Sequence, residues 1–176
     1  MKDIKKIVSG NKINSKVFSL GREAYIVGGY LRNLLVGKES KDIDYIVRGN
    51  IREFAAQMLV GERGSASIVE LKKEQMIRIV FKSGLTLDFT ELKGGLKDNL
   101  GERDFTMNAL AWSPETGLIY PFNGAKDIAK QRIKAVSIDN FRNDPLRLLR
   151  TYRFVSELGW KAEPETRKMA RHLRKE

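Results

Sequence analysis

The chain has 176 residues, enough for one domain and the start of a second, and 41% of them are hydrophobic, enough for a core. It contains no cysteine and one histidine, His172, which excludes disulfides and thiolate chemistry and leaves oxygen-ligated metals as the plausible metal class. Lys and Arg total 33 against 22 Asp and Glu, a formal net charge of +11, so RNA, DNA and nucleotides are the expected partners.

Strand and helix signals alternate through the first sixty residues. The apolar run Glu23–Val27 predicts a short buried strand leading into a glycine pair, and Tyr30–Val36 then predicts a helix. Ile43–Val47 alternates apolar residues and predicts a second strand. Asn50, with an acid three residues later, is typical of a helix N-cap, and it precedes a predicted helix over Phe54–Leu59.

The middle of the chain carries a hairpin signal. Met76–Phe81 and Leu85–Phe89 predict two strands joined by a tight turn at Ser83–Gly84. The polar, glycine-rich stretch Lys93–Gly101 predicts a loop, and Thr106–Trp112 predicts a helix.

The C-terminal part predicts helices with a basic surface. Asp144 followed by proline is typical of an N-cap and first helical position, opening a helix to about Leu158, and a further helix is expected over Glu165–Lys175. From Lys130 to the end there are 13 basic and 6 acidic residues. The whole pattern predicts an α+β (mixed α/β) fold with a small mixed β-sheet, followed by a basic helical segment.

Two aspartates lie two positions apart in the second predicted strand. Because strand side chains alternate, Asp42 and Asp44 share one face while Ile43 and Tyr45 point to the other. Carboxylates at this spacing can bind a pair of divalent ions, which is the arrangement used in two-metal phosphoryl transfer. The alternative is a pair of solvated aspartates at a strand end, because the pattern also occurs by chance.

A third acid falls on a neighbouring predicted strand. Leu85, Leu87 and Phe89 share one face, so Asp88 lies on the opposite, polar face. It could complete a three-acid metal cluster, or it could simply be an exposed position on a half-solvated sheet.

Four motifs occur in the order typical of one enzyme family. Together they resemble the bacterial class II tRNA nucleotidyltransferase and poly(A) polymerase family of the DNA polymerase β superfamily. The resemblance runs from about Ala24 to Trp160. The motifs are Val27-Gly-Gly-Tyr-Leu-Arg-Asn-Leu-Leu-Val-Gly37, Asp42-Ile-Asp44, Arg103-Asp-Phe-Thr-Met-Asn-Ala-Leu110 and Asp144-Pro-Leu-Arg-Leu-Leu-Arg-Thr-Tyr-Arg-Phe154.

The resemblance implies a template-independent, Mg²⁺-dependent enzyme that uses CTP and/or ATP. It implies a nucleotidyltransferase head (palm) over residues 1–137 and the beginning of an all-α neck over residues 138–176, which would take part in recognition of the nucleotide base. By motif position, the catalytic residues and ligands of a two-ion site are Asp42, Asp44 and Asp88.

The resemblance also implies a set of nucleotide-binding residues. Asp144 and Arg147 match a base-reading pair that accepts cytosine and adenine and rejects guanine and uracil by the order of donors and acceptors. The remaining members contact phosphates and sugar: Gly28, Gly29, Arg32, Arg103, Asp104, Asn108, Arg150 and Arg153. Each set also has a structural alternative. The glycine pair could form a plain strand-to-helix turn, and Arg103 with Asp104 could form an ion pair and a helix cap. Asp144 and Arg147 could form an i,i+3 salt bridge, and Arg150 and Arg153 could belong to a solvated basic helix face.

The chain departs from the family pattern in a few places. Asn33 and Asn143 replace acids, and Tyr120 replaces the opening acid of the third motif. The segment between Asp88 and Arg103 is short, and in this family a shortened loop is associated with enzymes that add CC without the terminal A. A CC-adding enzyme is therefore expected. The alternatives are a full CCA- or A-adding enzyme, a poly(A) polymerase, or a non-catalytic head that binds RNA or nucleotide.

The expected partners are the 3′ end of tRNA and a nucleoside triphosphate. Most members of the family continue into body and tail domains, so these domains or a separate RNA-binding subunit are also expected. No apolar run approaches the roughly 20 residues needed to span a bilayer, and the basic N-terminus leads into no hydrophobic region. We therefore expect no membrane association and a cytoplasmic protein.

Overall fold

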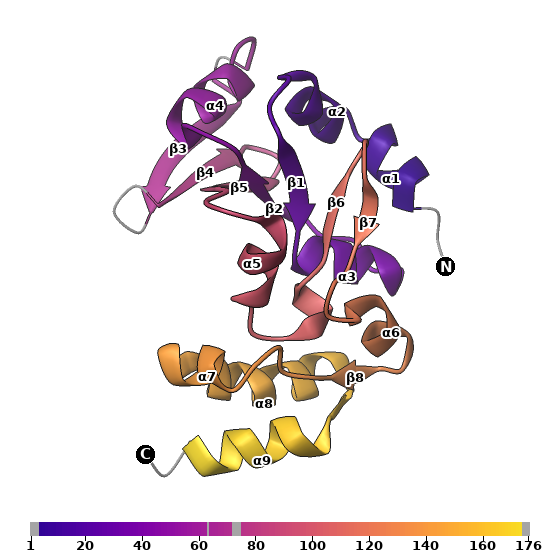
Figure 1. Cartoon of the computed structure of the whole chain (residues 1–176). Coiled ribbons are helices and arrows are strands. Elements are labelled where there is room, and N and C mark those ends of the chain that lie inside the picture. Colours follow the sequence, from indigo (N-terminus) through magenta and orange to yellow (C-terminus); the bar gives the residue numbers. More distant parts are fainter. Residues whose placement is uncertain (1–3, 63, 72–74, 174–176) are drawn as a thin grey trace. The chain divides into compact units, whose positions relative to one another are not determined.

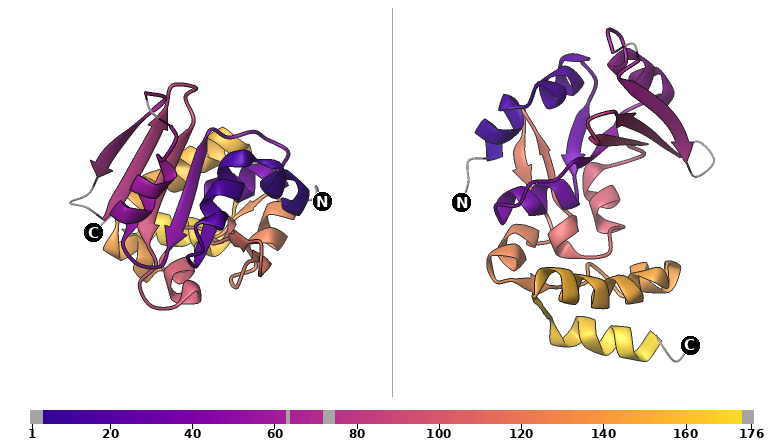
Figure 2. Two further views of the ribbon diagram at one scale, coloured as in Figure 1. Left: turned by 90° about the horizontal axis from the view of Figure 1, so that it is seen from above. Right: turned by 180° about the vertical axis from the view of Figure 1, so that it is seen from behind.

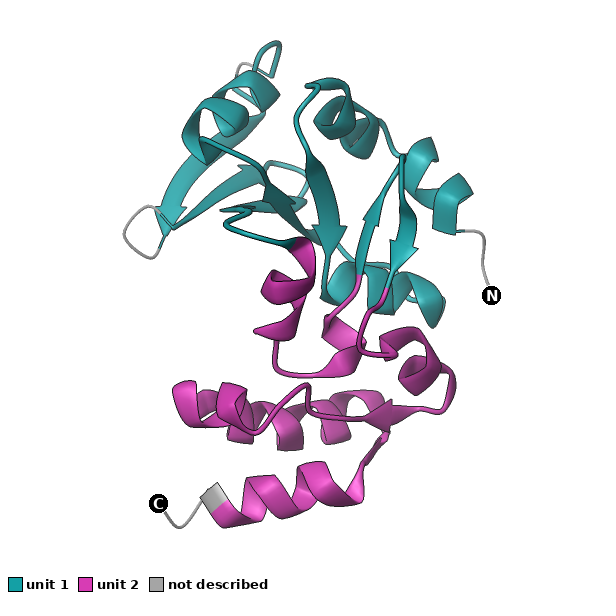
Figure 3. Ribbon diagram, viewed as in Figure 1, with its two compact units in different colours: residues 1–95, 111–119 teal, residues 96–110, 120–176 magenta. Residues whose placement is uncertain are grey.

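A computed structural model describes residues 4–62, 64–71 and 75–173. The chain divides into two units and passes between them three times. Unit 1 comprises residues 1–95 and 111–119, and unit 2 comprises residues 96–110 and 120–176 (Figure 3). Unit 2 includes residues on both sides of the predicted head–neck boundary after residue 137. That boundary was drawn between functional domains, and it stays a prediction.

Unit 1 is built on a seven-stranded mixed sheet in the order β3-β4-β5-β2-β1-β6-β7 (Figure 1). Only the β2–β5 pair is parallel, and every other pair of neighbours is antiparallel. The strands are β1 (Ala24–Val27), β2 (Asp42–Val47), β3 (Ala66–Leu71), β4 (Met76–Phe81), β5 (Thr86–Glu91), β6 (Ala111–Ser113) and β7 (Gly117–Ile119).

The apolar face of the central strands forms the core of unit 1. Tyr45 of β2 stacks on Phe89 of β5 with ring centroids 5.1 Å apart, and Phe54 contacts the same ring at 5.4 Å. The Tyr45 hydroxyl donates a 2.5 Å hydrogen bond to Asn14 Oδ1. Burial raises the pKa of Tyr45 well above its usual value, so the ring stays a neutral donor.

Four helices accompany this sheet: α1 (Ile4–Gly10), α2 (Lys12–Ser19), α3 (Gly29–Leu35) and α4 (Ile51–Met58). Helix α3 contacts β1 and β2, and α4 contacts β4 and β5 (Figure 2). Asn50 caps α4 as predicted, because its side chain accepts hydrogen bonds from the backbone N–H groups of Arg52 and Glu53. Asn11 caps α2 in the same way.

Unit 2 is mainly helical. Its core is an aromatic cluster in which Phe105 meets Phe141 and Phe154 edge to face, at centroid distances of 5.6 and 5.5 Å. Its elements are α5 (Leu96–Gly101), the 3-10 helix η1 (Thr106–Asn108), α6 (Gly124–Ala129), β8 (Arg132–Ile133), α7 (Asp139–Asn143), α8 (Leu146–Leu158), β9 (Lys161–Ala162) and α9 (Pro164–Leu173).

Gly124 and Asp127 join the start of α6 to η1. A Cβ atom at Gly124 would lie 2.0 Å from the Thr106 carbonyl oxygen, so only glycine fits. The buried Asp127 carboxylate accepts hydrogen bonds from Thr106 Oγ1 at 2.6 Å and from Arg132 Nε at 2.8 Å. These contacts connect η1, α6 and β8 within unit 2.

Two predicted elements were wrong. Lys93–Gly101, predicted as a loop, contains α5, and Thr106–Trp112, predicted as a helix, divides into η1 and the start of β6. The second error has a tertiary cause, because Ala111 and Trp112 pair with β1 and β7 and this pairing outweighs local helix preference.

The other predicted strands and helices are confirmed to within two residues at most ends, but several elements had not been predicted. The helix predicted over Phe54–Leu59 begins earlier, at Ile51. The terminal helix was predicted over Glu165–Lys175, and its last two residues, 174 and 175, lie outside the described residues. Elements that were not predicted include α1, α2, β3, β7, α6 and α7. In the part of the chain that the structure describes, no helix has both the length and the apolar character needed to cross a bilayer.

Candidate active site

The acid pair lies at the start of β2. Asp42 is exposed and Asp44 is half-buried, while Ile43 and Tyr45 are buried on the opposite face. The predicted alternation is therefore confirmed, and it directs both carboxylates away from the side that contacts Phe54. Thr86 Oγ1 on β5 makes a short hydrogen bond to Asp42.

Asp88 lies directly beside the acid pair. It is the Cα partner of Asp44 across the parallel β2–β5 ladder, and Arg78 is its Cα partner on β4. Arg78 Nε donates to Asp88 Oδ1 at 2.7 Å, and Arg78 Nη2 donates to Asp88 Oδ2 at 2.6 Å. Both carboxylate oxygens of Asp88 thus accept hydrogen bonds from one guanidinium group.

The charges on this face are coupled. The pKa of Arg78 lies above its usual value, mainly because Asp88 accepts its hydrogen bonds, and the negative charges of Asp88, Asp42 and Asp44 add to the effect. Among the described residues, no three acidic, His or Cys side chains are gathered closely enough to hold a metal ion together. The donor set still fits Mg²⁺, because Asp42 and Asp44 offer hard oxygen ligands at neighbouring same-face positions. The assignment of Asp88 as a third ligand stays a prediction.

The glycine pair forms the turn between β1 and α3. Gly28 has φ 74°, a left-handed conformation that favours glycine. Arg32 is buried, and its Nε and Nη2 atoms donate to Asn33 Oδ1 at 3.2 and 3.0 Å. Asn33 therefore keeps an acceptor for Arg32 without the negative charge of the family's usual aspartate.

A polar cluster in unit 2 gathers three of the predicted nucleotide-binding residues. Buried Asp104 accepts hydrogen bonds at Oδ1 from the Phe105 backbone N–H at 2.8 Å and from Asn108 Nδ2 at 3.0 Å. Arg150 Nη2 of α8 lies 2.8 Å from Asp104 Oδ2, an ion pair without hydrogen-bond alignment. Among the described residues, Asp104 Oδ2 and Arg150 Nε are buried atoms without a hydrogen bond. Arg103 is half-buried beside this cluster.

Asp144 and Arg147 adjoin one another where α8 begins. Asp144 Oδ1 accepts a hydrogen bond from the Leu146 backbone N–H at 3.2 Å. The N-cap of α8 is Pro145, one residue later than the predicted cap at Asp144. Arg147 Nε lies 3.4 Å from Asp144 Oδ2, and Arg147 Nη1 donates to the Glu102 carbonyl oxygen at 2.7 Å. The Asp144 side chain is 42% exposed and that of Arg147 is 20% exposed, so both can still meet a ligand edge.

The outer part of α8 carries Arg153, which lies over the Phe154 ring at 4.8 Å and pairs with Glu157 at 3.6 Å.

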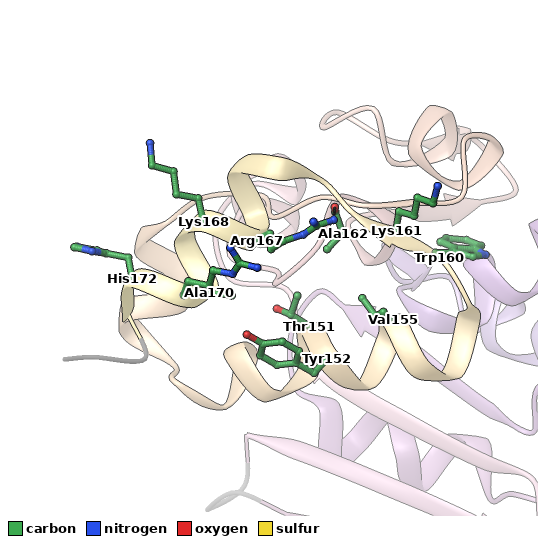
Figure 4. Close-up of a pocket in the computed structure, with 11 residues that line it drawn as sticks. Thr151, Tyr152, Val155, Trp160, Lys161, Ala162, Arg167, Lys168, Ala170 and His172 are labelled. Atoms are coloured by element: carbon green, nitrogen blue, oxygen red, sulfur yellow. Dashed lines mark hydrogen bonds between the residues drawn. The ribbon is translucent and has the colours of Figure 1, made fainter.

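A cavity of about 790 Å³ lies between α8 and α9 (Figure 4). Tyr152 and Val155 line it from α8, and Lys168 lines it from α9. None of the predicted nucleotide-binding residues lines this cavity.

Comparison with known proteins identifies the family. The sequence profile of the poly(A) polymerase head domain matches residues 24–95 and 86–134. The chain belongs to this family. The match contains the glycine pair, all three acids, and the Arg103–Asn108 segment, while α8 lies beyond it.

Relatives of this head domain act on tRNA. A CC-adding tRNA nucleotidyltransferase from Synechocystis sp. is 38% identical over 156 residues, which cover 86% of this chain and 37% of the relative. The structure is similar to a Thermotoga maritima CCA-adding enzyme complexed with tRNA, with a TM-score of 0.78, 29% identity, and coverage of 97% of this chain and 41% of that protein. It is also similar to a tRNA-processing enzyme with CTP, with a TM-score of 0.77, 31% identity, and coverage of 91% and 45%. The chain thus spans less than half the length of these proteins.

Arg78 is the residue of the head domain that the sequence analysis missed. It interrupts the apolar strand Met76–Phe81, where Ile77 and Ile79 are buried on the other face. The available signal was a lone arginine on the polar face of a predicted strand, in the same predicted hairpin as Asp88. The predicted tight turn at Ser83–Gly84 did not fix the register, and the structure places Arg78 opposite Asp88.

Proposed function

We propose that this chain is the catalytic head of a template-independent RNA nucleotidyltransferase that adds nucleotides from CTP and/or ATP to the 3′ end of tRNA. The observation that carries the proposal is the placement of Asp42 and Asp44 on one face of β2, beside Asp88, in a chain of this family. The basic charge of +11 supports a polyanionic substrate.

In the proposed reaction, the 3′ hydroxyl of the RNA attacks the α-phosphorus of the nucleotide. A new P–O bond forms, the bond to pyrophosphate breaks, and the hydroxyl proton passes to water. Asp42 and Asp44 would hold the divalent ions, which when bound lower the pKa of the attacking hydroxyl and stabilise the leaving group. Thr86 orients Asp42 through its hydroxyl, and the buried neighbours Ile43 and Tyr45 fix the strand that carries both acids.

The nucleotide's triphosphate and sugar are assigned to two sets of residues. Gly28 and Gly29 would let phosphate oxygens approach the backbone, and Arg32 would supply charge beside them. The second set is Arg103, Asp104, Asn108 and Arg150, supported by the buried polar atoms of Asp104 and Arg150 that have no hydrogen bond among the described residues. Arg153 would extend the basic surface of α8 toward phosphate.

Base choice is assigned to Asp144 and Arg147. A carboxylate acceptor and a guanidinium donor side by side match the amino donor and ring-nitrogen acceptor of cytosine or adenine. Guanine and uracil present the opposite order and would leave both partners unsatisfied, which is costly. The 3.4 Å separation within the pair and its exposure are consistent with this role.

We further propose that the protein is of the CC-adding type. The connection from Asp88 to Arg103 contains the end of β5 and the short helix α5, leaving little chain for a long flexible loop. The CC-adding relative supports this choice, and the CCA-adding structural match keeps the alternative of full CCA addition open to experiment. Body and tail domains or a separate RNA-binding subunit, and a cytoplasmic location, stay predictions.

The test is to incubate a tRNA lacking its 3′ CCA with each labelled nucleoside triphosphate and to size the products on a gel. Incorporation of C from CTP that requires Mg²⁺ and is lost in Asp42→Asn supports a catalytic head. Binding of RNA or nucleotide without any incorporation, by a longer protein that contains this head, would favour the non-catalytic alternative.

A further inference from the structure

Three consecutive backbone carbonyls at the end of α5 accept hydrogen bonds from side chains of α7 and α8. Asn140 Nδ2, in α7, donates to the carbonyl oxygens of Gly101 and Arg103, each at 2.7 Å. Arg147 Nη1, in α8, donates to the carbonyl oxygen of Glu102, between these two, also at 2.7 Å. All of these residues belong to unit 2 (Figure 3). Carbonyls at a helix C-terminus have no partner within the helix, so these side-chain donors complete the end of α5.

Asn140 is held in place by the residues beside it. Its neighbour Phe141 is 1% exposed and meets Phe105 edge to face at 5.6 Å, and the Asn140 backbone N–H donates to Ser137 Oγ at 3.2 Å. The side-chain amide has two N–H donors on one nitrogen, and the two carbonyls use both. The reversed amide would turn its oxygen toward two carbonyl oxygens, so its orientation is fixed by its partners. Asn140 therefore connects the aromatic core of unit 2 to the residues on both sides of Glu102.

The Glu102 carbonyl helps to set the direction of the Arg147 guanidinium. Asp144 Oδ2 lies 3.4 Å from Arg147 Nε, on another edge of the same group. A guanidinium is planar and its five N–H groups point in fixed directions, so contacts at two of its nitrogens determine how the remaining N–H groups point. Cytosine and uracil differ in which base atoms donate and which accept, so a guanidinium that turns freely discriminates poorly between them.

We propose that Asn140 is a positioning residue for base selection. By holding the carbonyls of Gly101 and Arg103 it fixes the Glu102 carbonyl, which orients the guanidinium of Arg147. Asn140 acts through the backbone of Glu102, and the exposed Glu102 side chain takes no part. This inference rests on the proposed function, because it requires that Arg147 reads the base.

The experiment measures the dissociation constants of CTP and UTP for the full chain in the presence of Mg²⁺ by isothermal titration calorimetry. The quantity compared is the ratio of the UTP constant to the CTP constant, because both nucleotides carry the same triphosphate and sugar. The variants are Asn140→Ala, which removes both donors, and Asn140→Asp, which keeps the shape but replaces the donor nitrogen with a carboxylate oxygen. Circular dichroism confirms that each variant is folded.

Two matched controls leave the three carbonyl contacts intact. Asp139→Asn changes the neighbouring residue of α7, which forms an exposed ion pair with Arg142 at 3.2 Å. Glu102→Ala removes a side chain and keeps the backbone carbonyl that Arg147 contacts. Both controls should leave the ratio unchanged.

We expect Asn140→Ala to lower the ratio roughly three- to tenfold, because Arg147 keeps its charge but loses its fixed direction. Asn140→Asp should lower it at least as far, since a carboxylate has no N–H to donate to the two carbonyls. The double variant Asn140→Ala/Arg147→Ala should have the same ratio as Arg147→Ala alone, because Asn140 acts through that guanidinium. A role of Asn140 in folding alone would not produce this dependence.

The inference is overturned if Arg147→Ala lowers the ratio whereas Asn140→Ala and Asn140→Asp do not. It is also overturned if Asn140→Ala lowers the ratio by the same factor with and without Arg147, or if Glu102→Ala lowers it as far as Asn140→Ala does. If the unaltered protein binds CTP and UTP equally, or if Arg147→Ala leaves the ratio unchanged, the base-reading assignment within the proposed function fails, and the inference fails with it. The two kinds of failure are therefore distinguishable.

Discussion

The buried carboxylate of Asp127 is the best place to test the folding logic of unit 2, which carries the base-reading pair. Asp127→Ala removes a hydrogen-bond acceptor that is 1% exposed. The hydroxyl of Thr106, a residue that is 2% exposed, then has no acceptor, and Arg132 loses its hydrogen bond to the carboxylate. An unsatisfied buried hydroxyl costs about 1–3 kcal/mol. A hydrogen bond to a charged group contributes about 1.5–3 kcal/mol, and we discount this term because the Arg132 side chain is 37% exposed.

These terms give an expected loss of about 2–4 kcal/mol in the free energy of unfolding of unit 2. The assay is urea unfolding followed by tryptophan fluorescence, because each unit contains one tryptophan: Trp112 in unit 1 and Trp160 in unit 2. In a Trp112→Phe background, the signal comes from Trp160, which is 7% exposed and reports on unit 2.

The matched control is Glu157→Ala, which removes an exposed ion pair with Arg153 on α8 and should cost less than about 0.5 kcal/mol. If Asp127→Ala unfolds at the same urea concentration as this control, the reasoning from burial and hydrogen bonding is refuted. A matching shift monitored at Trp112 would show instead that the two units unfold together.

Four further outcomes are expected. Asp42→Asn and Asp44→Asn should each abolish nucleotide incorporation while circular dichroism stays unchanged; near-normal activity with Mg²⁺ in either variant would remove the metal assignment. Arg147→Ala should lower kcat/KM for CTP by roughly 5- to 150-fold, equivalent to about 1–3 kcal/mol for one base contact, and equal use of all four nucleotides by the unaltered protein would contradict the base-reading pair. Tyr45→Phe should lower unfolding stability by about 1–3 kcal/mol because Asn14 loses its buried donor, and urea unfolding without such a shift would show that the bond contributes little. On a tRNA lacking CCA, a longer protein containing this head should stop after two cytidines even with ATP present, and gel detection of an added A would exclude the CC-adding type.

The local signals in the sequence were sufficient for several elements. The alternation in Ile43–Val47 predicted both the strand and the common direction of Asp42 and Asp44, because the side-chain period of a strand is independent of its partners. The cap at Asn50 was equally reliable, since a short polar side chain satisfies backbone N–H groups within the next few residues. The order of the motifs was enough to indicate the family.

Strand formation at one segment and the pairing of the strands that carry the acids were decided by the tertiary structure alone. Ala111–Ser113 forms a strand because β1 and β7 supply hydrogen-bonding partners on either side, although its local pattern favours a helix. The pairing of β5 with β2 decides that Asp88 stands beside Asp44, since the same strand on another edge would separate them. The β4–β5 register decides that Arg78 occupies both oxygens of Asp88. Sequence periodicity sets the face on which a charge lies, whereas the neighbour that neutralises it is set by strand order and register, which depend on the packing of the whole sheet.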